Sequence, residues 1–239
     1  MNSYFQFKQF TIHQDKCAMK VCTDACLFGA WVANKIEAEK TNPKNILDIG
    51  AGTGLLSLML AQKINTKIDA VELEEPAYLQ SKENIAAANF KNNISVHHAD
   101  IISFNPREKY DCIISNPPFF ENQLKSNDKE RNAAMHATTL SFEELVLAIK
   151  NNLTEDGTTF LLLPFYAVAD FEKIMHNQNL FITEQVNVKH TDKHNFFRAM
   201  LQIGFNNNAL AIESISIKNE VGVYSGQFID LLKSYYLHL

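Results

Sequence analysis

One segment of the chain combines an apolar strand with closely spaced glycines, an order of residues that suits cofactor binding. It reads Asn45-Ile-Leu-Asp-Ile-Gly-Ala-Gly-Thr-Gly54 and continues into the helix-like Leu55-Leu56-Ser57. Glycines let a ligand approach the backbone closely, and a helix that starts directly after them offers free N–H groups. Taken alone, the segment could also be a tight turn that binds nothing.

The spacing of its glycines and one acidic residue distinguish this turn from a dinucleotide site. Gly50, Gly52 and Gly54 are evenly spaced, whereas in the dinucleotide pattern the third glycine comes one residue later. Asp48 stands two residues before the first glycine, where its charge would repel a pyrophosphate and suit a cation. S-adenosylmethionine carries a sulfonium and an ammonium group and no phosphate. It is therefore the cofactor that the segment favours.

Two further carboxylates follow the next two predicted strands. Glu72 stands 22 residues after Gly50, about where an acidic residue grips ribose hydroxyls in a doubly wound fold. Asp100 follows the third strand and could accept a hydrogen bond from an adenine amino group. Each of them alone could also be a helix cap or a surface charge. In this order and spacing, the acids favour a nucleoside-containing cofactor.

A second segment could carry the reaction. The strand-like run Tyr110–Ser115 leads directly into Asn116-Pro117-Pro118-Phe119. Two consecutive prolines fix an extended corner, and this one falls at the carboxyl edge of the sheet, where ligands bind in open α/β folds. Asn116 offers a side-chain carbonyl, Pro117 a backbone carbonyl and Phe119 a ring. A rigid loop without catalytic role is the other interpretation of the motif taken alone.

These groups suit methyl transfer to an exocyclic amine. Such an amine is a poor nucleophile when its lone pair is delocalised into a ring or a carbonyl group. Two acceptors that hold its hydrogens orient the nitrogen and ease its pyramidalisation. No strong base is needed before attack, because the product cation can lose its proton afterwards. We therefore expect in-line displacement at the sulfonium methyl, driven by positioning and electrostatics.

The elements around these segments alternate as in a parallel sheet covered by helices on both faces. Pro76 marks the first turn of one helix, Ser141 to Glu144 form the capping box of another, and Gly157 marks the turn into the next strand. The predicted strands are Asn45–Ile49, Lys67–Val71, Ile94–His97, Tyr110–Ser115 and Thr158–Leu163, followed by Phe181–Lys189, Phe196–Phe205 and Leu210–Ile217 as an antiparallel edge.

The two ends of the chain complete a single domain over residues 1–239. Residues 1–40 hold a short alternating apolar run and a helix from Thr23 or Asp24, and we expect this extension to pack over the cofactor site. Residues 41–239 form the Rossmann-like core, and Tyr224–Leu239 reads as a final amphipathic helix.

Composition limits the classes of protein that the chain can represent. With 46% hydrophobic and 21% charged residues it is globular, and its net charge of −5 argues against non-specific coating of nucleic acid. No run approaches the roughly 18 apolar residues of a membrane span, and the first residues do not resemble a signal peptide. Cys17, Cys22 and Cys26 are too loosely spaced for a zinc site and are expected to be free thiols. We expect a cytoplasmic monomer with no metal and no obligatory protein partner.

The cofactor turn and the three acids resemble those of the class I, Rossmann-like S-adenosylmethionine-dependent methyltransferases, over about residues 20 to 205. The resemblance implies an α/β fold with a seven-stranded, mostly parallel sheet, an antiparallel edge and helices on both faces. A helix N-cap is the other role for Thr23 and Asp24. The residues expected to bind the cofactor are Lys20, Thr23, Asp24, Asp48, Gly50, Gly52, Gly54, Glu72, Asp100 and Asn116.

The Asn-Pro-Pro-Phe motif resembles the amino-methylating branch of these enzymes, which modifies adenine N6, cytosine N4, guanine N2 or the glutamine amide. The segments Phe5–Ile12, Cys17–Asp24 and Tyr224–Leu237 are similar to the bacterial tRNA(Val) adenine-N6 methyltransferases, which act on the adenine just 3′ of the anticodon. This resemblance implies tRNA as the substrate. It also implies catalysis by Asn116, Pro117 and Phe119, with substrate contacts from Pro118, Phe119, Phe120, Lys125, Lys129 and Arg131.

Several alternatives remain open at this point. The same motif could serve a protein-glutamine N5 or a ribosomal RNA guanine-N2 methyltransferase, and a module that binds cofactor without turnover is a third possibility. Basic residues also cluster at Lys8, Lys16 and Lys20 and at Lys189, His190, Lys193, His194 and Arg198, and each cluster could be an ordinary solvated face. We expect the loop after Phe120 to be the main RNA contact.

Overall fold

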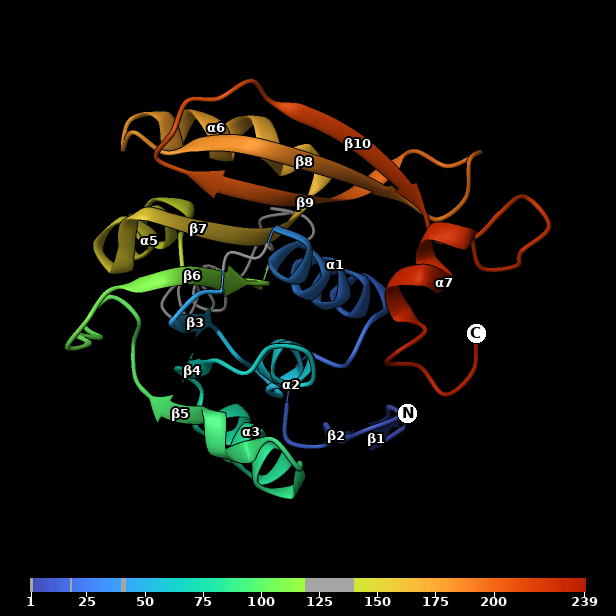
Figure 1. Cartoon of the computed structure of the whole chain (residues 1–239), viewed down its shortest axis with the longest axis horizontal. Coiled ribbons are helices and arrows are strands. Elements are labelled where there is room, and N and C mark those ends of the chain that lie inside the picture. Colours follow the sequence, from blue (N-terminus) through green and yellow to red (C-terminus); the bar gives the residue numbers. More distant parts are fainter. Residues whose placement is uncertain (1, 18, 40–41, 119–139) are drawn as a thin grey trace, which may run out of the picture.

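An eight-stranded sheet organises the chain, with a two-stranded hairpin beside it (Figure 1). The computed structural model describes residues 2–17, 19–39, 42–118 and 140–239. The strand order in the large sheet is β10-β8-β9-β7-β6-β3-β4-β5. Its strands are β3 (Asn45–Ile49), β4 (Lys67–Glu72), β5 (Ile94–His98), β6 (Tyr110–Ser115), β7 (Leu153–Pro164), β8 (Phe181–Lys189), β9 (Phe196–Gly204) and β10 (Ala211–Ser216).

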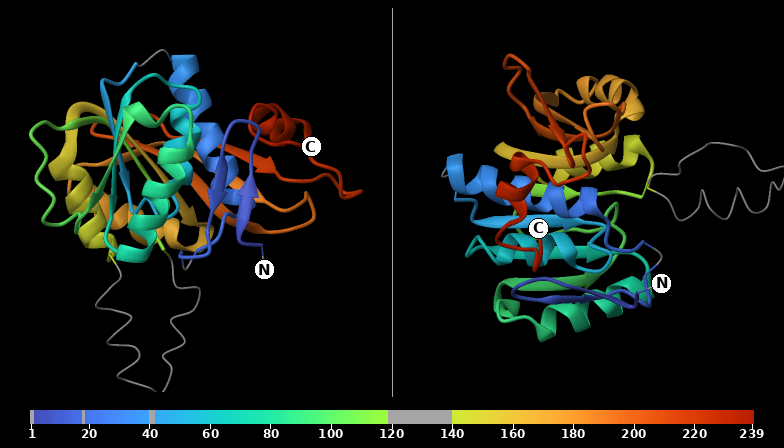
Figure 2. Two further views of the ribbon diagram at one scale, coloured as in Figure 1. Left: turned by 90° about the horizontal axis from the view of Figure 1, so that it is seen from below. Right: turned by 90° about the vertical axis from the view of Figure 1, so that its right-hand side faces the viewer.

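Helices cover both faces of this sheet (Figure 2). One side carries α1 (Thr23–Glu39), α2 (Leu55–Ala61), α3 (Glu75–Ala87) and α7 (Gly226–Leu232), and the other carries α5 (Phe142–Asn152) and α6 (Val168–His176). Two short 3-10 helices, η1 (Lys91–Asn93) and η2 (Phe165–Ala167), precede β5 and α6. Because strand side chains alternate between faces, neighbours such as Ile46 and Leu47 belong to separate cores.

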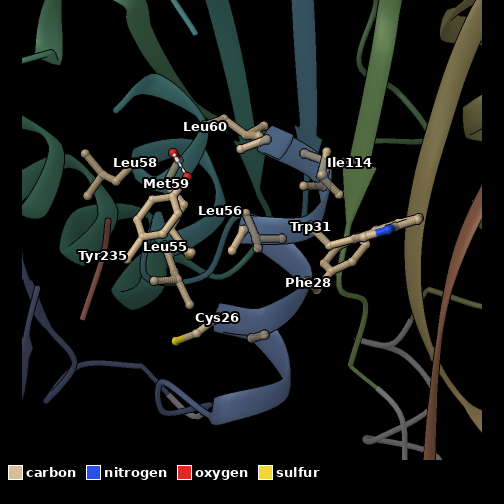
Figure 3. Close-up of a cluster of buried hydrophobic side chains, with 14 of the residues drawn as sticks. Cys26, Phe28, Trp31, Leu55, Leu56, Leu58, Met59, Leu60, Ile114 and Tyr235 are labelled. Carbon is tan, nitrogen blue, oxygen red and sulfur yellow. Dashed lines mark hydrogen bonds between the residues drawn. The ribbon is translucent and has the colours of Figure 1, made fainter. Parts of the chain in front are cut away.

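The helices α1 and α2 pack closely against each other in the core (Figure 3). Phe28 and Trp31 of α1 are buried here, beside the apolar side chains of α2. Gly29 permits the close approach, because a Cβ at this position would lie 2.8 Å from the sulfur of Met59. The Tyr235 hydroxyl donates to the carbonyl oxygen of Met59 at 3.0 Å, which ties the C-terminal segment to the same core.

The order of the strands places a ligand crevice at the end of β3. From β3 the chain moves outward to β4 and β5, and then returns on the other side of β3 to form β6 and β7, all five strands being parallel. Such a reversal leaves a crevice outside the carboxyl ends of the strands, because the helices that follow β3 and β6 cover opposite faces. The cofactor turn and the Asn-Pro-Pro motif both begin at this edge.

The hairpin of β1 (Tyr4–Gln6) and β2 (Thr11–His13) joins the two ends of the chain. Phe7 forms a β-bridge with Tyr236, and the Lys8 N–H donates to the Tyr235 carbonyl at 2.8 Å. The hairpin also lies against α3. This contact directs the residues after His13 toward the carboxyl edge of the sheet. In the part of the chain that the structure describes, no helix has the length and apolar character needed to cross a bilayer.

Most predicted elements are confirmed, some at the same residues. The strands Asn45–Ile49, Tyr110–Ser115 and Phe181–Lys189 have the predicted bounds, α1 begins at Thr23, and Ser141 caps α5 in a complete capping box. The Rossmann-like α/β fold with helices on both faces is confirmed.

Three local predictions were wrong. Gly157 does not mark a turn before a strand but lies inside β7, which begins at Leu153 and bulges opposite β6. The sheet has eight strands rather than seven, and its last strand, β10, runs parallel to β8. The C-terminal helix ends at Leu232, because Tyr235 and Tyr236 turn back to pack against α2 and the hairpin.

Candidate functional site

A cavity of about 700 Å³ lies at the carboxyl edge of the sheet, where β3, β4 and β6 end. Its wall is mainly apolar with a few polar groups, as is usual for small-molecule sites. Two other cavities, of about 590 and 510 Å³, contain none of the predicted site residues. The large cavity brings together Lys20, Gly50, Gly52, Glu72, Asp100, Asn116, Pro117 and Pro118.

The turn after β3 is shaped for a ligand beside it. Gly50, Gly52 and Gly54 have φ values of 71°, 55° and 79°, a left-handed region that favours glycine. A Cβ added to Gly50 would meet no atom within 4 Å, so the space beside it is open. The N–H groups of Gly50 and Gly52 are not free, however, because they donate to the Val71 carbonyl and to Glu72. The turn therefore lets a ligand come close to the backbone, but the N–H groups of Gly50 and Gly52 do not serve as free donors to it.

Glu72 is held in place at the end of β4 by two backbone donors. Its Oε2 accepts from the Gly52 N–H at 2.7 Å, and its Oε1 accepts from the Glu74 N–H at 2.8 Å. Each carboxylate oxygen can accept a second hydrogen bond, so the side chain is oriented and still able to accept from ribose hydroxyls. Asp100 is similarly oriented, since its Oδ1 accepts from the Ile102 N–H at 2.9 Å.

Asp48 lies in β3, is fully buried and does not line the cavity. Its Oδ2 accepts from the Ser57 hydroxyl at 2.6 Å and from the Ser57 N–H at 3.2 Å, while Oδ1 has no hydrogen-bond partner among the residues that the structure describes. Burial raises the pKa of Asp48 to about 6, against the two Ser57 hydrogen bonds, and nearby Glu72 adds to the rise. A buried carboxylate with an unpartnered oxygen is costly unless a positive ligand offsets it. The arrangement fits the cationic S-adenosylmethionine.

The reactive motif is fixed to the same cavity by a hydrogen bond between strands. The Ser115 hydroxyl donates to the Ile49 carbonyl at 2.7 Å, which joins the last residue of β6 to the last residue of β3. Asn116 follows and is half-buried in the cavity wall, with Pro117 buried and Pro118 exposed. The motif and the cofactor turn therefore face one space, as their order in the sheet predicted.

The sequence and structure of the chain were compared with those of known proteins. The family model for the methyltransferase small domain matches residues 31–162. A tRNA1(Val) (adenine(37)-N6)-methyltransferase of Dyadobacter fermentans is 39% identical over 99% of this chain and 98% of its own. The protein of the same name from Pseudoalteromonas translucida is 40% identical over 99% of this chain and all of its own. The chain belongs to this methyltransferase family.

Solved structures agree with that membership at the level of the fold. A predicted O-methyltransferase from Agrobacterium tumefaciens superposes with a TM-score of 0.68 at 17% identity, covering 88% of this chain and 96% of its own. A class I S-adenosylmethionine-dependent methyltransferase from Listeria monocytogenes gives a TM-score of 0.60 at 15% identity, over 85% and 67% of the two chains. The predicted enzyme class and its cofactor, S-adenosylmethionine, are confirmed.

Some residues predicted to bind the methyltransferase's cofactor have other partners. Asp24 accepts from the Arg198 guanidinium at 2.9 Å, and neither it nor Thr23 lines the cavity. Gly54 caps α2 instead of facing the cavity. Lys20 lines the cavity, but its ammonium group donates to the carbonyl oxygens of Gln14 and Cys17. Cofactor contacts from these four residues, and from the predicted residues that line the cavity, stay predictions.

Several residues that were predicted to act in catalysis or substrate binding are not among those that the structure describes. Phe119, Phe120, Lys125, Lys129 and Arg131 lie outside the described residues. Their roles in catalysis and substrate binding also stay predictions.

One wall of the cofactor cavity comes from residues that were not predicted to contact the cofactor. Its N-terminal part is formed by Lys16, Cys17, Met19, Val21 and Cys22. Buried amides hold this wall: Gln14 accepts from the Val21 N–H at 2.8 Å, and Gln80 accepts from the Lys16 N–H at 3.2 Å. A third buried amide, Asn84, exchanges two hydrogen bonds with the backbone of His13. Gln80 and Asn84 stand four residues apart on α3, a spacing that could have revealed a shared polar face.

The cysteines add to the packing of the methyltransferase. All four are free, with Cys26 and Cys112 fully buried, and burial raises the pKa of Cys17 to about 11. Among the described residues, no three His, Cys, Asp or Glu side chains are grouped to hold a metal ion.

Proposed function

We propose that this chain transfers the methyl group of S-adenosylmethionine to N6 of adenine 37 in tRNA1(Val). The observation that carries the proposal is the meeting of Asn116 and Pro117 with the Gly50–Gly54 turn in one cavity. The names of the relatives, which align with this chain over nearly its full length, support the choice of substrate.

In this mechanism the protein orients the amine and holds the charges. S-adenosylmethionine supplies an electrophilic methyl group when it is bound. The Asn116 side-chain carbonyl and the Pro117 backbone carbonyl accept the two N6 hydrogens, which directs the nitrogen lone pair toward the methyl. No residue has to remove a proton before attack, because the methylated amine is acidic enough to lose one to water afterwards.

The remaining polar groups of the cavity would bind the cofactor. Glu72 would accept from its ribose hydroxyls, and Asp100 from its adenine amino group. Asp48, ionised above its pKa of about 6, would favour the positive end of the ligand. The mainly apolar wall would exclude water, which strengthens each of these interactions.

The proposal also covers the location of the enzyme, its oligomeric state and its contacts with RNA. Because tRNA modification takes place in the cytoplasm, we infer a cytoplasmic protein that acts as a monomer, away from membranes and without an obligatory protein partner. One domain would carry the activity, with the N-terminal segment closing over the cofactor. Phe119 would stack on adenine 37, and Pro118, Phe120, Lys125, Lys129 and Arg131 would contact the surrounding RNA.

The test is transfer of label to defined RNA. The protein is incubated with methyl-labelled S-adenosylmethionine and an unmodified tRNA1(Val) transcript, and the digested nucleosides are identified by mass spectrometry. We expect N6-methyladenosine, and no label in a transcript whose adenine 37 is replaced by guanine. Label that enters protein glutamine or ribosomal RNA guanine instead would refute the proposed substrate while keeping the reaction.

A further inference from the structure

The carboxyl edge of the sheet continues beyond Asn116 as a surface rich in rings and cations. Next to β6 along this edge come the end of β7, the start of β9 and the end of β8 (Figure 1). The register aligns Pro164 of β7 with Arg198 of β9, and Lys189 of β8 with Phe196 of β9. Residues distant in sequence therefore meet here.

Two aromatic side chains are exposed to solvent at this edge. Phe165 and Tyr166 follow β7 directly and are 37% and 67% exposed. Phe165 packs on Phe196 with ring centroids 5.2 Å apart. The exposed His190 ring is stacked on Phe197, with ring centroids 4.1 Å apart and an interplanar angle of 5°. This stacking fixes the orientation of the His190 ring.

Cations accompany these rings. Residues 189–198 contain three basic side chains, two histidines and a single acidic residue in a chain whose net charge is −5. The Lys189 ammonium lies 5.7 Å from the Phe196 ring centroid, and it pairs with Asp192 at 3.0 Å. Lys193 pairs with Glu220 at 3.2 Å. The Lys193–Glu220 pair is exposed and the Lys189–Asp192 pair is partly exposed. Surface ion pairs are weak, so Lys193 can exchange its partner for a phosphate at little cost.

We propose that Phe165, Tyr166, Lys189, His190, Lys193 and Phe196 form a docking surface for the single-stranded nucleotides beside the target adenine. We call this set the ring–lysine surface. Stacking rings with nearby cations is the combination that binds unpaired nucleotides. The inference rests on the proposed function, since it assigns flanking nucleotides to an RNA whose target base enters at Asn116.

The distance along the edge decides which nucleotides the surface meets. Adjacent strands lie about 4.8 Å apart, so the step from β6 to β7 is about 5 Å and the three steps to β8 cover about 14 Å. The β8 end of the surface is therefore too far from Asn116 to hold the reacting base. It is at the right distance for the next few nucleotides of a loop whose bases are already unstacked.

Binding of a labelled anticodon stem-loop of tRNA1(Val), measured by fluorescence anisotropy with S-adenosylhomocysteine present, tests the inference. Tyr166→Ala and His190→Ala should each weaken binding about fivefold or more, as expected for loss of one stacked base. Tyr166→Phe, which keeps the ring, should bind within about twofold of wild type. Ile212→Ala, which changes an exposed apolar side chain near the start of β10, serves as the matched control.

The role of the lysines is tested by measuring how RNA affinity depends on salt concentration. The double variant Lys189→Gln with Lys193→Gln should lower the slope of log Kd against log salt by about 1.4, the value for two contacts to single-stranded phosphates. S-adenosylhomocysteine affinity should stay unchanged in every variant, which shows that the fold is intact. An unchanged salt slope would count against the surface even if a ring variant failed to fold.

The outcomes separate this inference from the proposed function. If wild type methylates tRNA and all the variants bind the stem-loop equally well, the ring–lysine surface is wrong and the function stands. If the variants lose binding to a protein substrate and not to RNA, the surface has a different partner and the inference is overturned. If wild type neither binds nor methylates the RNA, the proposed function itself fails.

Discussion

The side-chain amide nitrogen of Asn84 donates to the carbonyl oxygen of Thr53 at 2.9 Å, inside the cofactor turn. The same nitrogen donates to the His13 carbonyl at 2.8 Å, and the side-chain oxygen accepts from the His13 N–H at 2.9 Å. Asn84 is only 1% exposed. One side chain of α3 therefore joins the turn that faces the cofactor to the beginning of the N-terminal wall of the cavity.

Asn84→Ala should weaken cofactor binding more than RNA binding. The substitution leaves three backbone groups without their partner, and each unsatisfied buried group costs about 1–3 kcal/mol. Since part of this cost is relieved by movement of the wall, we expect an affinity for S-adenosylhomocysteine lower by about 10-fold to 100-fold. Isothermal titration calorimetry measures it.

The matched control is Asn93→Ala, which removes a half-buried asparagine whose side-chain amide donates to Asn65 at 2.8 Å, away from the cavity. This variant should bind as wild type does. Equal affinity of the Asn84 and Asn93 variants would show that the link between wall and turn has no part in binding.

The buried carboxylate of Asp48 makes the stability of the apo protein depend on pH. Its pKa of about 6 in the folded state lies above the usual 3.8, so between these values the folded protein holds more protons than the unfolded chain. Stability therefore falls as pH rises from about 4 to about 6, by about 3 kcal/mol in total. Asp48→Asn should remove this loss and raise the melting temperature of the apo protein at pH 8 but not at pH 4.

Cofactor binding should show the opposite dependence on pH. Only the ionised Asp48 attracts the cationic ligand, so the affinity of wild type for S-adenosylmethionine should increase as pH rises through about 6. In Asp48→Asn the affinity should be lower at pH 8 and nearly constant over this range. Titrations at pH 5, 6, 7 and 8 distinguish the two profiles, and parallel profiles would remove Asp48 from the binding mechanism.

The parts of the site that sequence could predict are those set by local patterns. Gly50 and Gly52 follow an apolar strand, and two prolines follow another, so periodicity and backbone restriction placed both motifs at one sheet edge. The sequence could not show that Asp24 faces Arg198, because that ion pair joins residues 174 positions apart. Tertiary pairing of this kind leaves no local signal.

Buried amides escape sequence interpretation for a related reason. Gln14, Gln80 and Asn84 have side chains that are usually exposed, and only the folded chain shows the backbone groups that they satisfy. The same holds for β10, since an apolar alternating run predicts a strand but not its neighbour. Its parallel pairing with β8 depends on the path of the connection after β9.

Asn116→Ala should reduce kcat without a matching loss of cofactor affinity. The variant removes one of two acceptors that orient the amine, and the loss of one preorganised polar group lowers kcat by about 100-fold to 1000-fold. Single-turnover methylation of the tRNA1(Val) transcript measures the step, and S-adenosylhomocysteine binding should change less than about threefold. Asn105→Ala, an exposed asparagine after β5, is the control. A variant with normal kcat would exclude Asn116 from catalysis.

Gly29→Ala should destabilise the protein because α1 and α2 are too close for a side chain at this position. The added methyl would lie 2.8 Å from the Met59 sulfur and 3.2 Å from Cδ2 of Leu56, well inside ordinary contact distance. Overpacking of a core costs about 1–3 kcal/mol, so urea denaturation should show a lower midpoint. Gly226→Ala is the matched control, since a Cβ at that helical glycine meets nothing within 4 Å, and the change should be neutral or slightly stabilising. Equal midpoints for the two variants would mean that α1 can move away from α2 at no cost.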